Sequence, residues 1–329
     1  MYKNITIICI LLSILTGCTN HREFIAVLSS DLDSNNSKVT ILDKELDNIK
    51  TKNINESGLT QISYDEEEYN ILSSYNSKII TLSNEKVKKQ NSSLPYPLFS
   101  IYNSNWELMV YNFDKKNDIN FYTYELKKSS GELVSKRLEG IPFSVQEYGK
   151  KIYTVARNMN EPIDKQFSLN ILSAKDLRVL KKVQLGIPYA LSDMNVKHNK
   201  IYLTMFNLEE GKQSESKVLI YNLKSNELRE IHLKYNNGNE VIPLKEGFLI
   251  KHNTSKNTTT FVLYNDSYRY QTELKINKAI IKTKYWKDSL YYLTESKTLE
   301  KYDLKQKKVT NSIKLKDNTN DFIIIKQGS

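Results

Sequence analysis

The chain has 329 residues with a formal net charge of +10, and it contains only two cysteines, Cys9 and Cys18. A domain of this length can bury enough apolar surface to fold without disulfides. Cys9 lies in an apolar N-terminal run that we expect to be removed, so only Cys18 would remain. This excludes an internal disulfide, a thiolate metal site and a catalytic cysteine in the body of the protein.

Residues 1–17 have the pattern of a signal peptide. Lys3 precedes an apolar run over residues 5–15, which is too short to cross a bilayer because a spanning helix needs about 20 residues. The run ends in Leu15-Thr16-Gly17-Cys18, which resembles the lipobox of bacterial lipoproteins. The resemblance implies cleavage between Gly17 and Cys18 and lipidation of Cys18. The alternative is an ordinary secretory signal with an incidental cysteine. Residues 18–23 would form a short lipidated tether, and the folded domain would span residues 24–329.

A strand-turn-strand unit recurs along the chain and is clearest in residues 200–233. Apolar and aromatic residues fill residues 201–206 and 218–223, and the polar residues 224–227 break the run as a hairpin turn does. Both faces of these two strands are apolar, as in a sheet that lies between neighbouring sheets. The same leucine, short polar turn and apolar residue recur at Leu42/Leu46, Leu82/Val87, Leu126/Leu133, Leu172/Leu177, Leu223/Leu228, Leu263/Tyr268 and Leu304/Val309.

Successive leucines of these pairs lie 40 to 51 residues apart, which is typical of β-propeller blades. Another apolar strand precedes each pair, so the repeat predicts an all-β fold: a seven-bladed β-propeller of four-stranded antiparallel blades. A sandwich of unrelated hairpins is the alternative. The first blade has only three strands of its own, and residues 321–326 form an isolated apolar strand after the seventh. We therefore expect this C-terminal strand to join the N-terminal blade and close the ring.

The loops indicate which face of the propeller binds a partner. If the strands of each blade are lettered A to D from the axis outward, the B–C and D–A loops share one face. Residues 92–99, between blades two and three, form the only cluster of prolines and aromatic residues in the chain. Because loops on a rigid scaffold often carry function, we expect this face to bind. The candidate binding residues are Tyr96, Phe99, Arg157, Tyr189 and Phe206. Further candidates for an aromatic platform that stacks on sugars are Tyr285 and Trp286.

The sequence carries no recognisable catalytic signature. It lacks a G-x-S-x-G elbow and a glycine-rich phosphate loop, and its four histidines are too scattered for a zinc or copper site. We therefore expect no catalytic residue, no metal, no cofactor and no enzymatic activity. Asp193 and Glu240 are the carboxylates on the expected inner strands, and neither has an evident partner. The acidic residues 65–68 are interpreted as a solvated hairpin tip.

Two blades resemble the YVTN-type β-propeller repeat of bacterial surface and envelope proteins. The resemblance rests on residues 151–155, 169–173 and 183–186 in one blade and residues 200–204 in the next. The Val-Thr-Asn core of that family is absent, and the other blades match only in pattern. The resemblance implies a seven-bladed scaffold for binding, and it carries over no ligand and no catalytic residue.

These patterns together predict a lipid-anchored protein on the extracytoplasmic face of a bacterial membrane. Its propeller would bind an envelope protein or an anionic wall polymer, since a basic surface outside a cell favours anionic lipid headgroups and anionic polymers. The expected signal peptide argues against nucleic acid as a partner. One alternative is an enzyme, either glycan-processing or cofactor-dependent, that acts in the envelope. Another is a sensor or modulator subunit of an export or signalling complex.

Overall fold

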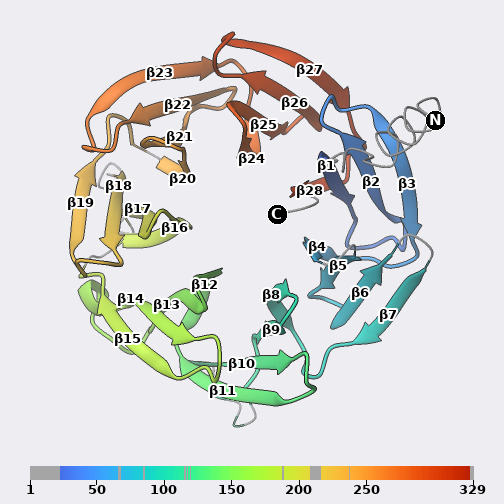
Figure 1. The fold of residues 1–329 in the computed structure, drawn as a ribbon, viewed down its shortest axis with the longest axis vertical. Helices are drawn as coiled ribbons and strands as arrows, with labels where there is room; N and C mark the ends of the chain where they lie inside the picture. The colour runs from blue at the N-terminus through green and yellow to red at the C-terminus, as the bar shows by residue number, and fades with distance from the viewer. Residues whose placement is uncertain are drawn as a thin grey trace, which may run out of the picture.

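A computed structural model describes residues 23–326 apart from residues 66–67, 84–85, 115, 117, 119, 187–188, 208–215 and 237. The described residues form 28 strands in seven four-stranded antiparallel sheets, arranged in a ring around a central opening (Figure 1). The chain is a seven-bladed β-propeller. The expected signal peptide and the cleavage residues Gly17 and Cys18 lie outside the described residues, as does most of the expected tether.

The blades follow one another in chain order around the ring, and within each blade the strands run from the innermost to the outermost. Blade one consists of β28 (Thr319–Lys326), β1 (Glu23–Ser29), β2 (Ser37–Asp43) and β3 (Asn48–Ile54). Blade two consists of β4 (Leu59–Asp65), β5 (Glu68–Ser73), β6 (Lys78–Leu82) and β7 (Val87–Asn91). Blade three consists of β8 (Pro97–Asn103), β9 (Trp106–Tyr111), β10 (Phe121–Lys128) and β11 (Leu133–Glu139).

The remaining four blades repeat this order. Blade four consists of β12 (Ile141–Tyr148), β13 (Lys151–Arg157), β14 (Phe167–Ser173) and β15 (Val179–Gln184), with the short helix η1 (Ile163–Lys165) between β13 and β14. Blade five consists of β16 (Tyr189–Lys197), β17 (Lys200–Asn207), β18 (Ser216–Asn222) and β19 (Leu228–His232). Blade six consists of β20 (Gly238–Pro243), β21 (Phe248–Ser255), β22 (Thr258–Tyr264) and β23 (Tyr270–Ile276). Blade seven consists of β24 (Ile280–Trp286), β25 (Ser289–Thr294), β26 (Thr298–Asp303) and β27 (Lys308–Lys314).

The hydrophobic core lies between the blades. Every residue of the second strand β25 is buried, whereas every residue of the outermost strand β7 is exposed. One core cluster joins Tyr153 and Leu169 of blade four to Leu191 and Leu203 of blade five. The apolar character of both faces of the middle strands therefore reflects a neighbouring blade on each side, as the sequence predicted.

The ring is closed by the pairing of β28 with β1, which confirms the expectation for the C-terminal strand. Phe322 lies opposite Val27 and Ile324 lies opposite Ile25 in an antiparallel ladder. Phe322 is completely buried in a cluster that also contains Leu293 of blade seven. The closing strand thus fills the space between the last blade and the first.

The two faces of the ring differ in which connections they carry. We call the face with the B–C and D–A connections the loop face and the face with the A–B and C–D turns the turn face. Glu23 at the start of β1 pairs with Lys326 at the end of β28. Because β1 is a second strand that runs toward the loop face, both of these ends lie on the turn face.

All seven innermost strands carry a β-bulge at the same place. In β16, Leu191 pairs with Met205 and Asp193 pairs with Thr204, so Ser192 is the extra residue. A bulge bends the strand locally and re-aims the next side chain. The residues that follow the seven bulges are Gln61, Phe99, Ser144, Asp193, Glu240, Lys282 and Asp321.

Candidate functional site

Tyr96 is presented on the loop face by a tightly held connection. It lies between β7 and β8, its amide donates to the hydroxyl of Ser77 at 3.1 Å, and its carbonyl accepts from the amide of Asn112 at 2.9 Å. These bonds tie the connection to the B–C loops of blades two and three. The backbone of Tyr96 has a φ of 55°, and its side chain is 57% exposed. The ring is therefore held in place with most of its surface toward solvent.

Exposed apolar side chains gather in the connections and strand ends of the loop face. Six large apolar residues there, in blades one to four, are between 38% and 66% exposed, and Ile281, the extra residue in the bulge of β24 in blade seven, is 40% exposed. Among the described residues, no large apolar side chain within the A–B and C–D turns themselves is exposed to that degree, although the outermost strands expose eight such residues close to the C–D turns, among them Ile49, Leu133 and Tyr270. We refer to the six as the loop-face apolar residues: Leu32, Tyr75, Tyr96, Phe143, Met159 and Ile163.

Two other predicted binding residues have different surroundings. Phe99 is half-buried and packs against the core shared by blades three and four, so only part of its side chain is open to a partner. Arg157 ends β13 at the loop face, where its Nε donates to Gln166 at 2.8 Å and its guanidinium lies 5.5 Å from the ring of Phe167.

The four aromatic candidates of the later blades do not form one platform. The backbones of Tyr189 and Phe206 lie at the loop-face ends of β16 and β17, and their side chains are outside the described part of the structure. Tyr285 and Trp286 lie next to the β24–β25 turn on the opposite face. Tyr285 and Trp286 therefore cannot stack on the same ligand as Tyr96.

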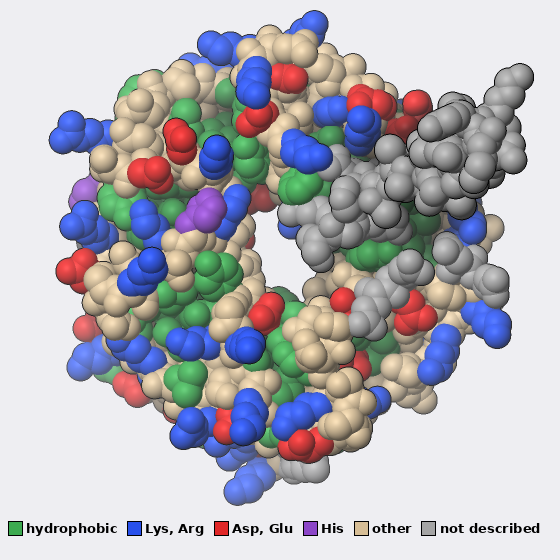
Figure 2. Space-filling view, in the orientation of Figure 1, with side chains coloured by type: hydrophobic (Ala, Val, Ile, Leu, Met, Phe, Trp, Pro, Cys, Tyr) green, Lys and Arg blue, Asp and Glu red, His purple; other side chains and the backbone are tan. Residues whose placement is uncertain are grey.

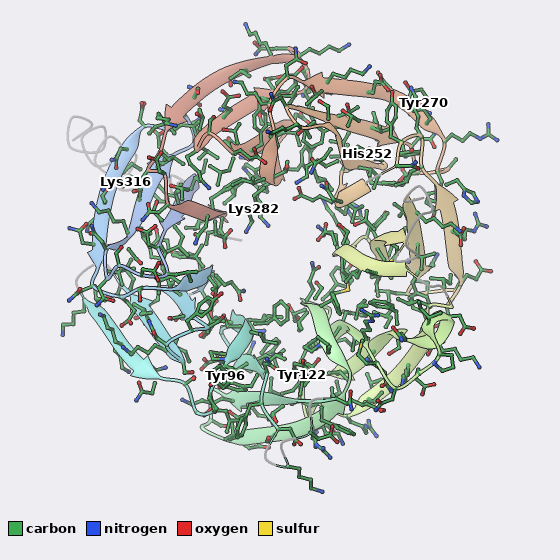
Figure 3. The ribbon with its side chains drawn as sticks, turned by 180° about the vertical axis from the view of Figure 1, so that it is seen from behind. Tyr96, Tyr122, His252, Tyr270, Lys282 and Lys316 are labelled. Carbon is green, nitrogen blue, oxygen red and sulfur yellow. The ribbon has the colours of Figure 1, made fainter. Side chains whose placement is uncertain are left out.

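Charged side chains line one side of the central opening. Four of the seven post-bulge residues are ionisable and follow one another in blades five, six, seven and one: Asp193, Glu240, Lys282 and Asp321. Glu240 pairs with Lys251 at 2.6 Å, and Lys282 pairs with Asp321. Figure 3 shows Lys282 at the inner edge of the ring, far inward of Tyr270 on the rim. Glu240 thus has a cationic partner, Lys251, on the neighbouring strand.

Two of these groups titrate near neutral pH. Burial, with the nearby charge of Glu240, raises the pKa of Asp193 to about 7. Burial, with the nearby charge of Lys284, lowers the pKa of Lys282 to about 7. The inner wall of blades five to seven can therefore hold or release protons around pH 7, which ordinary surface carboxylates and amines do not do.

Post-bulge side chains also join neighbouring blades. Asp193 accepts from the amide of Val241 in blade six at 3.0 Å. Gln61 both donates to and accepts from the backbone of Ser100 in blade three, at 2.9 and 3.1 Å. Asp321 accepts from the amide of Ile62 in blade two at 3.4 Å. Each of these hydrogen bonds joins a post-bulge side chain to the backbone of a neighbouring blade. The inner polar residues therefore help to hold adjacent blades together, in addition to any chemical role. The sequence held a signal for them, because in blades two, three, four, five and seven the post-bulge residue stands seven positions before the next strand begins.

Among the residues that the structure describes, no group of three or more His, Cys, Asp and Glu side chains is placed to hold a metal ion. His252 is completely buried, its Nδ1 lies 3.2 Å from the carbonyl of Asn236, and burial lowers its pKa to about 4. It is therefore a neutral core residue at physiological pH. Asp65 and Glu68 flank the β4–β5 turn, as predicted for a hairpin tip. No helix in the described part of the chain is long and apolar enough to cross a membrane.

Comparison with known proteins finds the architecture again at low sequence identity. No protein-family model matches the chain, and no curated protein matches its sequence. The structure of apo AztD from Citrobacter koseri superposes with a TM-score of 0.58 at 8% identity, over 93% of this chain and 98% of that one. BamB from Moraxella catarrhalis gives a TM-score of 0.55 at 10% identity, over 88% and 86% of the two chains.

A third similar structure is that of an enzyme. The dihydro-heme d1 dehydrogenase NirN gives a TM-score of 0.61 at 11% identity, over 92% of this chain and 74% of that one. What the chain shares with all three is the fold. Identities this low carry no ligand or activity from one protein to another, so function has to be argued from the site.

Proposed function

We propose that the protein is an extracytoplasmic lipoprotein, anchored through Cys18, whose loop face binds a protein of the cell envelope. The observation that carries this proposal is the separation of the two faces. The chain enters β1 at Glu23 on the turn face, and the loop-face apolar residues lie on the other.

The tether fixes how the propeller would stand on the membrane. Four residues lie between Cys18 and Glu23, and the five Cα-to-Cα steps from one to the other span at most about 18 Å. Two or more acyl chains on the cysteine suffice for stable attachment. The turn face would thus be held close to the bilayer, and the loop face, with Tyr75 and Tyr96, would be directed away from it toward a partner.

The side chains on the loop face favour a protein over a wall polymer. Tyr, Phe and Met are enriched at protein interfaces, and exposed apolar groups in one region mark interaction sites. An anionic polymer would instead need a block of positive charge. Along the chain, Lys and Arg are interleaved with Asp and Glu rather than gathered in one block, and Figure 2 shows the same mixture on the one face of the ring that it views.

The test uses the full-length protein in membranes. Partners of the native protein are captured by cross-linking and identified by mass spectrometry, and the capture is repeated with a Tyr75→Ala/Tyr96→Ala variant. Tyr270→Ala is the matched control, because Tyr270 is 45% exposed on the outer strand β23, away from the loop face. We expect the double variant to lose a partner that the control keeps. Equal capture by both variants would contradict the assignment of the loop face.

Anchoring is tested separately with Cys18→Ala, which should move the protein from the membrane fraction to the soluble extracytoplasmic fraction. Retention of this variant in the membrane would contradict lipid attachment at Cys18 without bearing on the loop face.

A second candidate function is an enzyme that acts on envelope glycan, and the proton-holding groups of the inner wall favour it. Asp193 and Lys282 have pKa values of about 7, which suits acid–base chemistry at neutral pH. Under this proposal, purified protein degrades isolated wall glycan, and Asp193→Asn abolishes the activity. Capture of a protein partner with no glycan turnover would leave the interaction scaffold as the function.

A further inference from the structure

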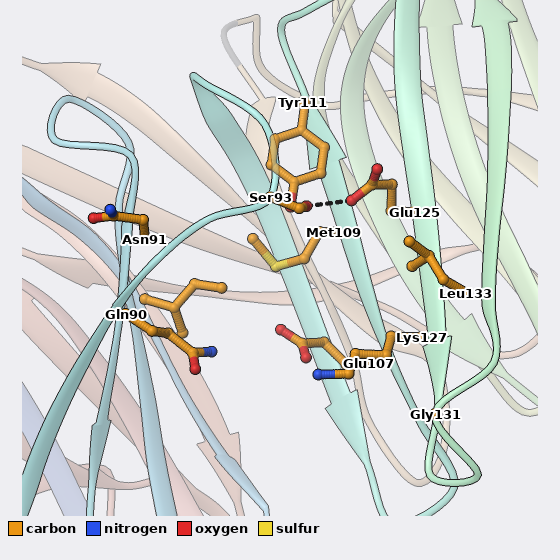
Figure 4. Close-up of a pocket in the computed structure, with 11 residues that line it drawn as sticks. Gln90, Asn91, Ser93, Glu107, Met109, Tyr111, Glu125, Lys127, Gly131 and Leu133 are labelled. Atoms are coloured by element: carbon orange, nitrogen blue, oxygen red, sulfur yellow. Dashed lines mark hydrogen bonds between the residues drawn. The ribbon is translucent and has the colours of Figure 1, made fainter.

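A cleft of about 370 Å³ lies between blades two and three. One wall comes from β6 and β7, with Ile79 and Gln90, and the other from β9 and β10, with Met109 and Glu125 (Figure 4). Its upper end in the figure is bounded by Ser93, which belongs to the same connection as Tyr96. A volume of this size suits a small molecule.

Glu125 is an unusual residue for such a wall. Its side chain is only 9% exposed, although it lies on β10 among residues that border the cleft. Its carboxylate accepts a hydrogen bond from the hydroxyl of Ser93, whose oxygen also lies 2.7 Å from the hydroxyl of Tyr111. Within the described residues, no Lys or Arg forms an ion pair with Glu125. A buried carboxylate that is held only by a neutral hydroxyl would be stabilised by a cation at short range.

The other charges of the cleft balance each other. Glu107 on β9 lies directly opposite Lys127 on β10 in the ladder, and both border the cleft. Burial raises the pKa of Glu107, while a hydrogen bond from Tyr102 and the charge of Lys127 oppose that effect. The excess negative charge of the cleft therefore belongs to Glu125.

The remaining walls are apolar near the centre of the cleft. Ile79 and Met109 belong to one small core cluster, and Leu133 on β11 is 55% exposed at the edge. A ligand that reaches Glu125 would lie against these side chains. Such surroundings suit a short hydrocarbon chain better than a highly hydrated ion.

We propose that this cleft binds a compact organic cation, a primary ammonium or guanidinium group on a short apolar chain. The cationic group pairs with the carboxylate of Glu125 beside the hydroxyls of Ser93 and Tyr111. The hydrocarbon chain lies against Ile79 and Met109. Because Ser93 and Tyr96 share one connection, the bound cation would also brace the loop face.

The test is isothermal titration calorimetry of the full folded domain with butylammonium and agmatine, with butyrate as the charge-reversed control. We expect saturable binding of one cation per chain and no binding of butyrate. Glu125→Gln should weaken cation binding about tenfold or more, since a charge-assisted hydrogen bond is lost. Glu132→Gln is the matched control, because Glu132 is exposed on the same blade and pairs with Lys128 at 2.8 Å.

A second variant guards against misfolding of the first. Gln90 is exposed on the outer strand β7, so Gln90→Lys adds a positive charge to the cleft without disturbing the core. It should weaken cation binding about threefold or more through repulsion. Saturable binding that both variants reduce and the control keeps supports the proposal. Absence of saturable cation binding by the native protein, or equal affinity in a folded Glu125→Gln variant, overturns it.

Discussion

Asp193 offers a sharp test of the electrostatics of the inner wall. Its carboxylate is buried beside Glu240 and accepts from the amide of Val241, and its pKa is raised to about 7. A raised carboxyl pKa means that the folded protein holds the proton more tightly than the unfolded chain. Stability from this group is therefore full at low pH and is lost as pH rises from about 4 to about 7. Asp193→Asn keeps an oxygen that can accept from Val241 and removes the titration.

The magnitude follows from the size of the shift. Each pH unit of difference corresponds to about 1.4 kcal/mol, so a shift of about three units would lower the free energy of unfolding by about 4 kcal/mol. The side chain retains some exposure, and solvent screening reduces the effect. As the pH rises from 5 to 8, we therefore expect the free energy of unfolding of the native protein to fall by about 2 kcal/mol relative to that of Asp193→Asn.

The assay is urea denaturation of the native protein, Asp193→Asn and the control Asp33→Asn at pH 5 and pH 8. Asp33 is exposed in the β1–β2 loop, so its variant should follow the native protein at both pH values. Parallel stability of all three proteins would refute the reasoning, because it would show that Asp193 titrates alike in the folded and unfolded states.

Two further predictions concern the backbone and the seam. Phe322→Ala should lower the free energy of unfolding by about 3–5 kcal/mol because Phe322 is fully buried. Ile323→Ala, at a half-buried position on the same strand, should lower it by less. Equal decreases in urea denaturation would contradict the importance of the seam. Gly247→Ala should destabilise the fold strongly, since a Cβ there would stand 2.0 Å from the carbonyl oxygen of Tyr264. Gly131→Ala, also at positive φ but with no atom within 4 Å of the added Cβ, should lower the free energy of unfolding by only about 1 kcal/mol. Similar melting temperatures for the two variants would refute the steric argument.

Much of the fold could be predicted because each blade repeats a local pattern. Leu42, Leu82, Leu126 and Leu172 are all completely buried, and each stands on a third strand just before its turn. Such a position depends on local alternation and hairpin geometry, both of which are visible in sequence. Ring closure followed from counting strands, because the first blade lacked one.

The site was less predictable because it depends on the bulges and on contacts between blades. Glu240 and Lys251 lie on adjacent strands, but their pairing requires the extra residue Asn239 to shift the register. The half-buried position of Phe99 depends on its packing against the core shared by blades three and four, which alternation along one strand does not reveal. Glu125 looked like an ordinary strand residue, and only the neighbouring blade makes it a buried carboxylate.

The seam between β28 and β1 has a consequence for biogenesis. Ser29 and Thr319 share a hydrogen bond of 2.8 Å although they are 290 positions apart. While the chain is being synthesised or exported, the edge of β1 has no partner until residues 319–326 arrive. An open edge invites pairing with other chains, and such distant pairing forms slowly. Products truncated before β28 would keep that edge exposed to proteases and to aggregation. Only a chain that extends through Lys326 can complete the first blade and protect the edge.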